Sequence, residues 1–130
     1  YQASLGGVQV DLIVRGMCSL RVGESFSKNI NVYSVIGRYL EHHRIFYFKN
    51  NGEEKLYLSS ADWMERNLSR RIEVSFPIEG KKLIDNILNE GLNIFINGRD
   101  SWKLKNDYSY DHKKLKKHEI TPQEEILLTR

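Results

Sequence analysis

The sequence has few of the residues that mark secreted or membrane-spanning proteins. It contains one cysteine, Cys18, and two prolines in 130 residues. One cysteine forms no internal disulfide, and small secreted domains usually carry several, so we expect a reducing compartment, the cytoplasm. No apolar run approaches the roughly 18 residues that cross a membrane, and no signal peptide is visible. We therefore expect no transmembrane segment, with a peripheral location at the membrane as the alternative.

Several common enzyme motifs are also missing. The sequence has no Walker-type glycine-rich loop, no Cys/His metal cluster and no G-x-S-x-G elbow. We therefore predict no metal ligands in this chain. Its residues are 40% hydrophobic and 28% charged, with a formal net charge of +3. This balance is typical of a globular domain and suits a polyanionic ligand.

The pattern of apolar residues predicts an α/β fold, a mixed sheet flanked by helices. The predicted strands cover residues 8–15, 30–36, 44–49, 55–60, 71–78 and 102–105. Residues 62–68 predict a turn or a single helical turn. Asn50-Asn51-Gly52 predicts a hairpin turn, and an apolar stripe predicts a helix from residue 80 to about residue 97.

The two ends of the chain differ from its middle. The first residues resemble the last turn of a helix, with Gly6 and Gly7 as its left-handed exit. We therefore expect that the chain was cut from a longer protein and is truncated at its N-terminus. Residues 1–110 are predicted to form one domain, and residues 111–130 a basic and polar tail.

Arg15 follows the first predicted strand and is a candidate phosphate ligand. Ligands of open α/β sheets gather at the carboxyl ends of strands, where a guanidinium can hold phosphate oxygens in a bidentate way. An arginine in solvent or in a salt bridge explains the position equally well.

His42 and Arg44 form a second candidate pair. An imidazole titrates near neutral pH and acts as a nucleophile or as an acid/base, while a neighbouring cation holds anionic oxygens. On a strand, Arg44 would share the face of His42. From spacing alone, a structural or merely exposed histidine is the better interpretation.

Ser60 and Asp62 are candidate supporting residues. A serine can donate to phosphate, and Asp62 can orient the far nitrogen of a histidine. The alternative, slightly favoured by the local pattern, is ordinary capping of a helical turn.

Three stretches together resemble the long-chain polyphosphate kinases, specifically their last catalytic domain. They read YQASLGGVQVDLIVRGMCSLR, NINVYSVIGRYLEHHRIFYF and GEEKLYLSSADWMERNLSRRIEVSFPI, and a weaker match continues at WKLKNDYSY. The resemblance is long and ordered, and it covers nearly all of the chain except the tail. It implies an α/β fold similar to one half of a phospholipase D-type protein. His42 and Arg44 stand at the H-x-K positions of that fold, and residues 59–62 stand at its G-S-x-N positions.

The resemblance implies a part of an enzyme that reversibly transfers the terminal phosphate of ATP to polyphosphate. The phosphorylated histidine would lie in a preceding domain, so the isolated chain is expected to be inactive. His42 would be the catalytic second histidine and would contact nucleotide phosphates, as would Arg15. Arg44, Ser60 and Asp62 would support the site.

The implied cofactor is Mg²⁺ bound with ATP, held by ligands outside this chain. The implied partners are ATP or ADP, polyphosphate and the missing N-terminal domains, in an enzyme that is a homo-oligomer at full length. No nucleic acid is expected.

Two other functions stay open from the residues. One is a phospholipase D-like phosphodiesterase half, which is disfavoured because the acid expected near Lys49 is missing. The other is a non-enzymatic module in which the basic segment, residues 112–118, binds a polyanion.

Overall fold

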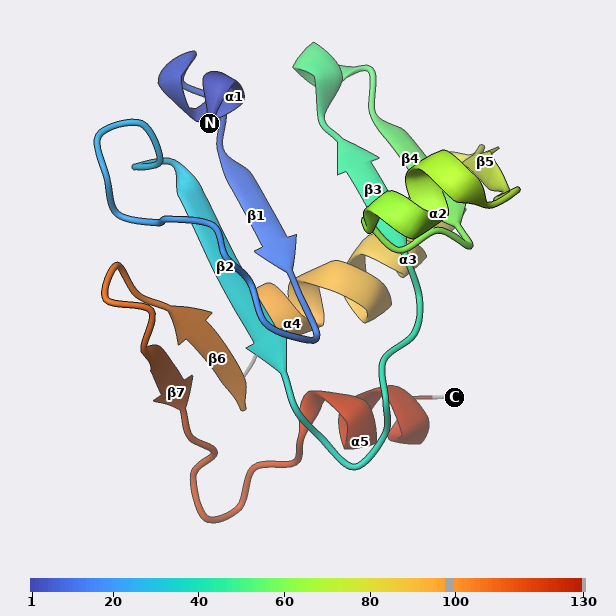
Figure 1. The fold of residues 1–130 in the computed structure, drawn as a ribbon. Coiled ribbons are helices and arrows are strands. Elements are labelled where there is room, and N and C mark those ends of the chain that lie inside the picture. Colours follow the sequence, from blue (N-terminus) through green and yellow to red (C-terminus); the bar gives the residue numbers. More distant parts are fainter. Residues whose placement is uncertain (98–99, 130) are drawn as a thin grey trace. The chain divides into compact units, whose positions relative to one another are not determined.

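A computed structural model describes residues 1–97 and 100–129 and confirms the α/β class. The chain divides into two compact units (Figure 1). The first unit combines Tyr1–Glu41 with Asn93–Arg130, and the second is His42–Leu92. Among the described residues the strands form two sheets, one in each unit, in place of the single mixed sheet that the sequence predicted. The reason is that, in the part of the chain that the structure describes, strands β3 to β5 pair with one another and not with the strands of the other sheet.

The sheet of the first unit is mixed. Its strands are β1 (Val10–Ile13), β2 (Ile30–Val35), β6 (Ser101–Leu104) and β7 (Tyr110–Lys113). Their order is β1-β2-β6-β7. The pair β1 and β2 is parallel, and the other two pairs are antiparallel. The carboxyl ends of β1 and β2 therefore lie at the same edge of the sheet.

The core of this unit forms where alternating apolar residues of the strands meet the loop between β1 and β2. Val22, Ile30, Val32 and Leu104 are its buried centre. Cys18 is a free thiol that packs against this centre from the loop. Apolar contacts thus hold the loop against the sheet. Arg15 lies near the start of this loop, just after β1.

Short helices accompany this sheet. The N-terminal helix α1 covers Gln2–Leu5, and of the two glycines that follow, Gly7 has a positive φ of 86° while Gly6 has −73°. Helix α4 (Ile94–Ile96) packs against β1 and β2 and buries Phe95.

The predicted tail contains regular structure. The first residues of the predicted tail belong to strand β7, which pairs with β6. Helix α5 (Pro122–Leu128) follows. The last residue of the tail, Arg130, lies outside the described residues.

The second unit is built on the antiparallel sheet β3-β4-β5. Its strands are β3 (Ile45–Phe48), β4 (Lys55–Ser59) and β5 (Ser75–Ile78). A 3₁₀ turn at Asn50–Gly52 closes the hairpin at the predicted place, with positive φ at all three of its residues. Helix α2 (Glu65–Arg70) connects β4 to β5, where the sequence predicted a turn or a single helical turn.

The long predicted helix is interrupted. It consists of α3 (Lys81–Leu88), a π-helical stretch at Asn89–Asn93, and then α4. Gly91 lies in the π-helical stretch and is buried, and a Cβ at this position would collide with the side chain of Ile45. Glycine therefore allows the observed close approach of the Ile45 side chain, whose Cδ1 end would have to move to make room for a Cβ.

No helix within the described residues is both long enough and apolar enough to cross a membrane.

Candidate functional site

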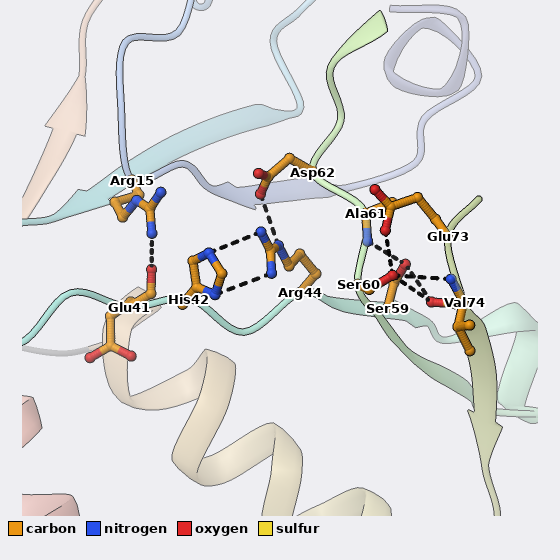
Figure 2. Close-up of polar contacts among 10 residues, drawn as sticks. All are labelled: Arg15, Glu41, His42, Arg44, Ser59, Ser60, Ala61, Asp62, Glu73 and Val74. Carbon is orange, nitrogen blue, oxygen red and sulfur yellow. Dashed lines mark hydrogen bonds and ion pairs between the residues drawn. The ribbon is translucent and has the colours of Figure 1, made fainter. Parts of the chain in front are cut away.

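Arg15 lies just beyond the carboxyl end of β1. The backbone of Val14 still donates to Tyr33 O at 2.8 Å, which extends the pairing with β2 to the residue before Arg15. Arg15 Nη1 donates to Glu41 O at 2.7 Å (Figure 2). This bond joins the residue after β1 to the loop after β2, at the edge where open α/β sheets bind ligands.

A cavity of about 260 Å³ opens at this edge. It is lined by Arg15 and by residues 35–41, which form the end of β2 and the loop that follows. A second, more apolar hollow of about 400 Å³ is lined by Arg15, Gly16, Met17, Ser34, Ile36, Trp102 and Tyr110. Arg15 lines both hollows and is an exposed residue.

His42, Arg44 and Asp62 form a contact cluster in the second unit. Figure 2 shows the Arg44 guanidinium between the other two side chains. Its Nε donates to Asp62 Oδ1 at 2.8 Å. Its two terminal nitrogens lie 3.3 Å from His42 Nδ1 and 3.2 Å from His42 Nε2. Local sequence explains this placement, because β3 begins just after Arg44 and Asp62 follows the end of β4, its partner strand.

The contact between Arg44 and His42 is better described as a cation beside a ring than as two hydrogen bonds. The two ring nitrogens point in diverging directions, and a neutral imidazole accepts at only one of them. The Asp62 carboxylate, through its hydrogen bond, raises the pKa of Arg44 above its usual value. The Arg44 side chain is only 18% exposed. The cluster therefore presents an oriented permanent cation next to an exposed imidazole, a combination suited to anionic oxygens.

Ser60 has partners other than this cluster. Its hydroxyl donates to Glu73 Oε2 at 2.5 Å and accepts from the backbone of Val74 at 3.0 Å (Figure 2). The neighbouring Ser59 Oγ accepts from Ala61 N at 3.1 Å, as in an ordinary serine turn. The single proton of the Ser60 hydroxyl is thus directed at a carboxylate.

The adjacent His43 has a different surrounding from His42. Its Nε2 lies 3.3 Å from Gly91 O, in the π-helical stretch. Insertion of such a stretch disrupts the regular α-helical bonding and is frequent at functional sites. The two histidines therefore have separate partners, and the His42 ring is the one in contact with Arg44.

The structure brings together some of the predicted site residues. His42, Arg44 and Asp62 form one contact cluster. In it Asp62 is bonded to Arg44, whereas the sequence offered it either to orient a histidine or to cap a helical turn. Ser60 lies with Glu73. Arg15 belongs to the first unit, so its convergence with His42 on one phosphate stays a prediction. The sequence did not suggest the carbonyl of Glu41, a backbone group that every residue carries, or the carboxylate of Glu73, which lies 13 residues from Ser60.

Within residues 1–97 and 100–129, no group of three or more His, Cys, Asp or Glu side chains is placed to hold a metal ion.

Comparison with known proteins agrees with the sequence resemblance. The family model described as "Polyphosphate kinase C-terminal domain 2" matches residues 1–123. A polyphosphate kinase of Pseudomonas aeruginosa is 56% identical over 111 residues, and one of Burkholderia lata is 54% identical over 112 residues. Each alignment covers 85% of this chain and 16% of the relative.

A solved structure shares the fold. The crystal structure of polyphosphate kinase from Porphyromonas gingivalis superposes with a TM-score of 0.82 at 35% sequence identity, over 98% of this chain and 20% of that one. This match confirms the predicted fold class, an α/β fold resembling one half of a phospholipase D-type fold. The chain thus corresponds in length to less than a quarter of each of these relatives. It belongs to the polyphosphate kinase C-terminal domain 2 family.

Proposed function

We propose that this chain is one catalytic part of an enzyme that reversibly transfers the terminal phosphate of ATP to polyphosphate. The contact of Arg44 with both ring nitrogens of His42, in a domain of the polyphosphate kinase family, carries this proposal. The phosphate passes first to a histidine in a preceding domain. The bond from phosphorus to the ADP oxygen breaks as a phosphorus–nitrogen bond forms. A terminal oxygen of polyphosphate then displaces the histidine nitrogen.

In this proposal His42 acts at the transferred phosphate as an acid/base or as an electrostatic partner. Such a role is worth roughly 10²–10⁴ in rate. Arg44 neutralises charge on the phosphate oxygens, and Asp62 keeps the guanidinium in position. Phosphate transfer depends mainly on positioning and charge stabilisation, and the cluster has residues for both tasks.

Arg15 is proposed to hold nucleotide phosphate oxygens. A guanidinium has five N–H donors, and the bond to Glu41 O uses one of them. The side chain is therefore oriented while it retains donors for phosphate. Its place at the carboxyl edge of a parallel strand pair supports this role.

The remaining parts of the proposal concern groups outside this chain. Mg²⁺ bound with ATP would supply further charge neutralisation, and we assign its ligands to other parts of the enzyme. The proposed partners are ATP or ADP, polyphosphate and the preceding domains of a full-length homo-oligomer. We propose that this enzyme is cytoplasmic or attached peripherally to a membrane.

The direct test is His42→Ala in the full-length enzyme, with His43→Ala as the matched control. Polyphosphate synthesis from ATP is measured, together with the melting temperature of each variant. His42→Ala is expected to lower kcat by about 10²-fold or more, on the scale of a lost acid/base group, with the fold intact. His43→Ala is expected to retain kcat within about threefold, because its ring contacts a backbone carbonyl.

Near-normal turnover by a folded His42→Ala enzyme would remove His42 from the reaction. An equal loss in both variants would show that the histidines act only by stabilising this segment.

A further inference from the structure

Gln123, on helix α5, is a buried polar residue that the proposed reaction does not use. The residue is 5% exposed. Its Nε2 donates to Tyr39 O at 2.7 Å and to Glu41 Oε1 at 2.6 Å. Its Oε1 accepts from Tyr39 N at 3.0 Å. One carboxamide thus satisfies both backbone groups of Tyr39 and also contacts Glu41, 82 residues away in sequence.

The loop is shaped to receive this side chain. A Cβ at Gly37 would collide with the Gln123 carboxamide, so only glycine permits the observed approach. Gln123 therefore contacts the loop from its first residue, Gly37, to its last, Glu41. A buried amide with satisfied donors and acceptors fixes its partners firmly, because breaking such bonds leaves unpaired polar groups.

The same loop reaches Arg15. The carbonyl of Glu41 accepts from Arg15 Nη1 at 2.7 Å, and residues 37–41 line the cavity of about 260 Å³ together with Arg15. A movement of this loop would therefore move the acceptor that orients the guanidinium. All of these residues belong to the first unit.

Helix α5 is itself anchored at its start. Thr121 and Glu124 form a capping box, in which the Thr121 hydroxyl accepts from Glu124 N and the Glu124 carboxylate accepts from Thr121 N at 2.8 Å. Pro122 occupies the first helical position and is buried. These features fix the backbone on both sides of Gln123.

We propose that Gln123 is a positioning residue, which holds the loop of residues 37–41 and through Glu41 O orients Arg15 for nucleotide phosphate. This inference rests on the proposed function, since it takes Arg15 as a phosphate ligand. The recognised ligand is the phosphate chain of ATP. Gln123 itself touches no substrate.

The test is a double-mutant cycle in the full-length enzyme, with KM for ATP and kcat measured for Arg15→Ala, Gln123→Ala and the double variant. Gln123→Ala is expected to raise KM about fivefold with kcat changed less than about twofold, since a uniform binding interaction is lost. Because Gln123 acts through Arg15, its loss should add little in the Arg15→Ala background. Glu125→Ala, an exposed change on the same helix, is the control and should leave KM unchanged.

A second variant covers the case in which Gln123→Ala fails to fold. Gln123→Glu keeps the size of the side chain, but it removes the donor to Tyr39 O and places a carboxylate against Glu41. It should raise KM at least as much as Gln123→Ala does. A wild-type KM in Gln123→Glu overturns the inference.

The double-mutant cycle also distinguishes a failure of the positioning role of Gln123 from a failure of the proposed role of Arg15. If Arg15→Ala leaves KM and kcat unchanged, the proposed role of Arg15 is wrong. If Arg15→Ala is damaging but Gln123→Ala has no effect, or has its full effect in the double variant, the positioning role alone is wrong.

Discussion

At the scale of single residues, the central feature is the support given to Arg44. Its Nε is bound by Asp62 while its terminal nitrogens lie against His42. A lysine in this place would offer a point charge without the planar fork that makes both contacts. The position therefore suits arginine, although the H-x-K pattern of the parent fold has lysine.

Asp62→Asn in the full-length enzyme tests this support. The change keeps the size of the side chain and removes the charge that holds Arg44. We expect kcat to fall by about tenfold or more, since a misplacement of about 1 Å in an active site can cost as much as about 10²-fold. Glu65→Gln is the matched control, because the Arg70–Glu65 pair is long at 3.8 Å and exposed, so its loss should leave kcat unchanged. Equal kcat values for the two variants would contradict a supporting role for Asp62.

Some of these residues could be predicted from the sequence, and others could not, for a physical reason. His42, Arg44 and Asp62 stand in or near motifs, and a strand pairing brings them into contact. Gln123 lies 84 residues from Tyr39, so only the folded chain shows that they meet. Glu41 acts on Arg15 through its backbone carbonyl, a group that every residue carries and that no motif distinguishes.

At the scale of elements, apolar alternation predicted six strands near their observed positions, while β7 and α5 were missed. Strand β7 is rich in charge and is recruited by pairing with β6. The start of helix α5 could have been predicted from the sequence. Thr121-Pro122-Gln123-Glu124 is a capping box with proline at the first helical position. That pattern predicts a helix start even within a polar tail.

Thr121→Ala tests the anchoring of α5. The loss of an N-cap hydroxyl costs about 0.5–2 kcal/mol, so thermal unfolding of the 130-residue chain should shift to lower temperature. Thr129→Ala, at the exposed end of the same helix, is the control with the same chemical change. A shift as large for Thr129→Ala as for Thr121→Ala would show that the cap contributes nothing of its own.

The pH dependence of stability tests a network between the β3–β4 hairpin and α3. Glu54 accepts from Lys81 Nζ at 2.5 Å and from Tyr47 Oη at 2.7 Å. The Lys81 bond first, and then the Tyr47 bond, lower the pKa of Glu54 below its usual value. The ionised Glu54 therefore stabilises the fold above its unfolded-state pKa, and this contribution is lost as pH falls through the lowered pKa.

Accordingly, wild type should be more stable than Glu54→Gln at neutral pH, and the difference in melting temperature should shrink as the pH is lowered toward acid. Glu53→Gln, the same change at an exposed neighbour, is the control, and its melting temperature is followed over the same pH range for comparison. If the difference in melting temperature between wild type and Glu54→Gln stays constant or grows as the pH falls, the network does not stabilise the fold as described.

At the scale of the whole molecule, the chain provides two compact units and 16% of the length of its relatives from Pseudomonas aeruginosa and Burkholderia lata. In the proposed function, the phosphate-accepting histidine would lie in a preceding domain. The isolated chain should therefore convert no ATP to polyphosphate under conditions in which the full-length enzyme is active. Sustained synthesis by the isolated chain would mean that it holds a complete active site.

The central claim is that Arg15 and His42 serve one phosphate chain. The most direct measurement is a crystal structure of the full-length enzyme with a non-hydrolysable ATP analogue. We expect oxygens of its phosphates to lie within hydrogen-bond distance of both the Arg15 guanidinium and the His42 imidazole. Phosphates bound away from both side chains, or Arg15 and His42 facing separate cavities, would contradict it.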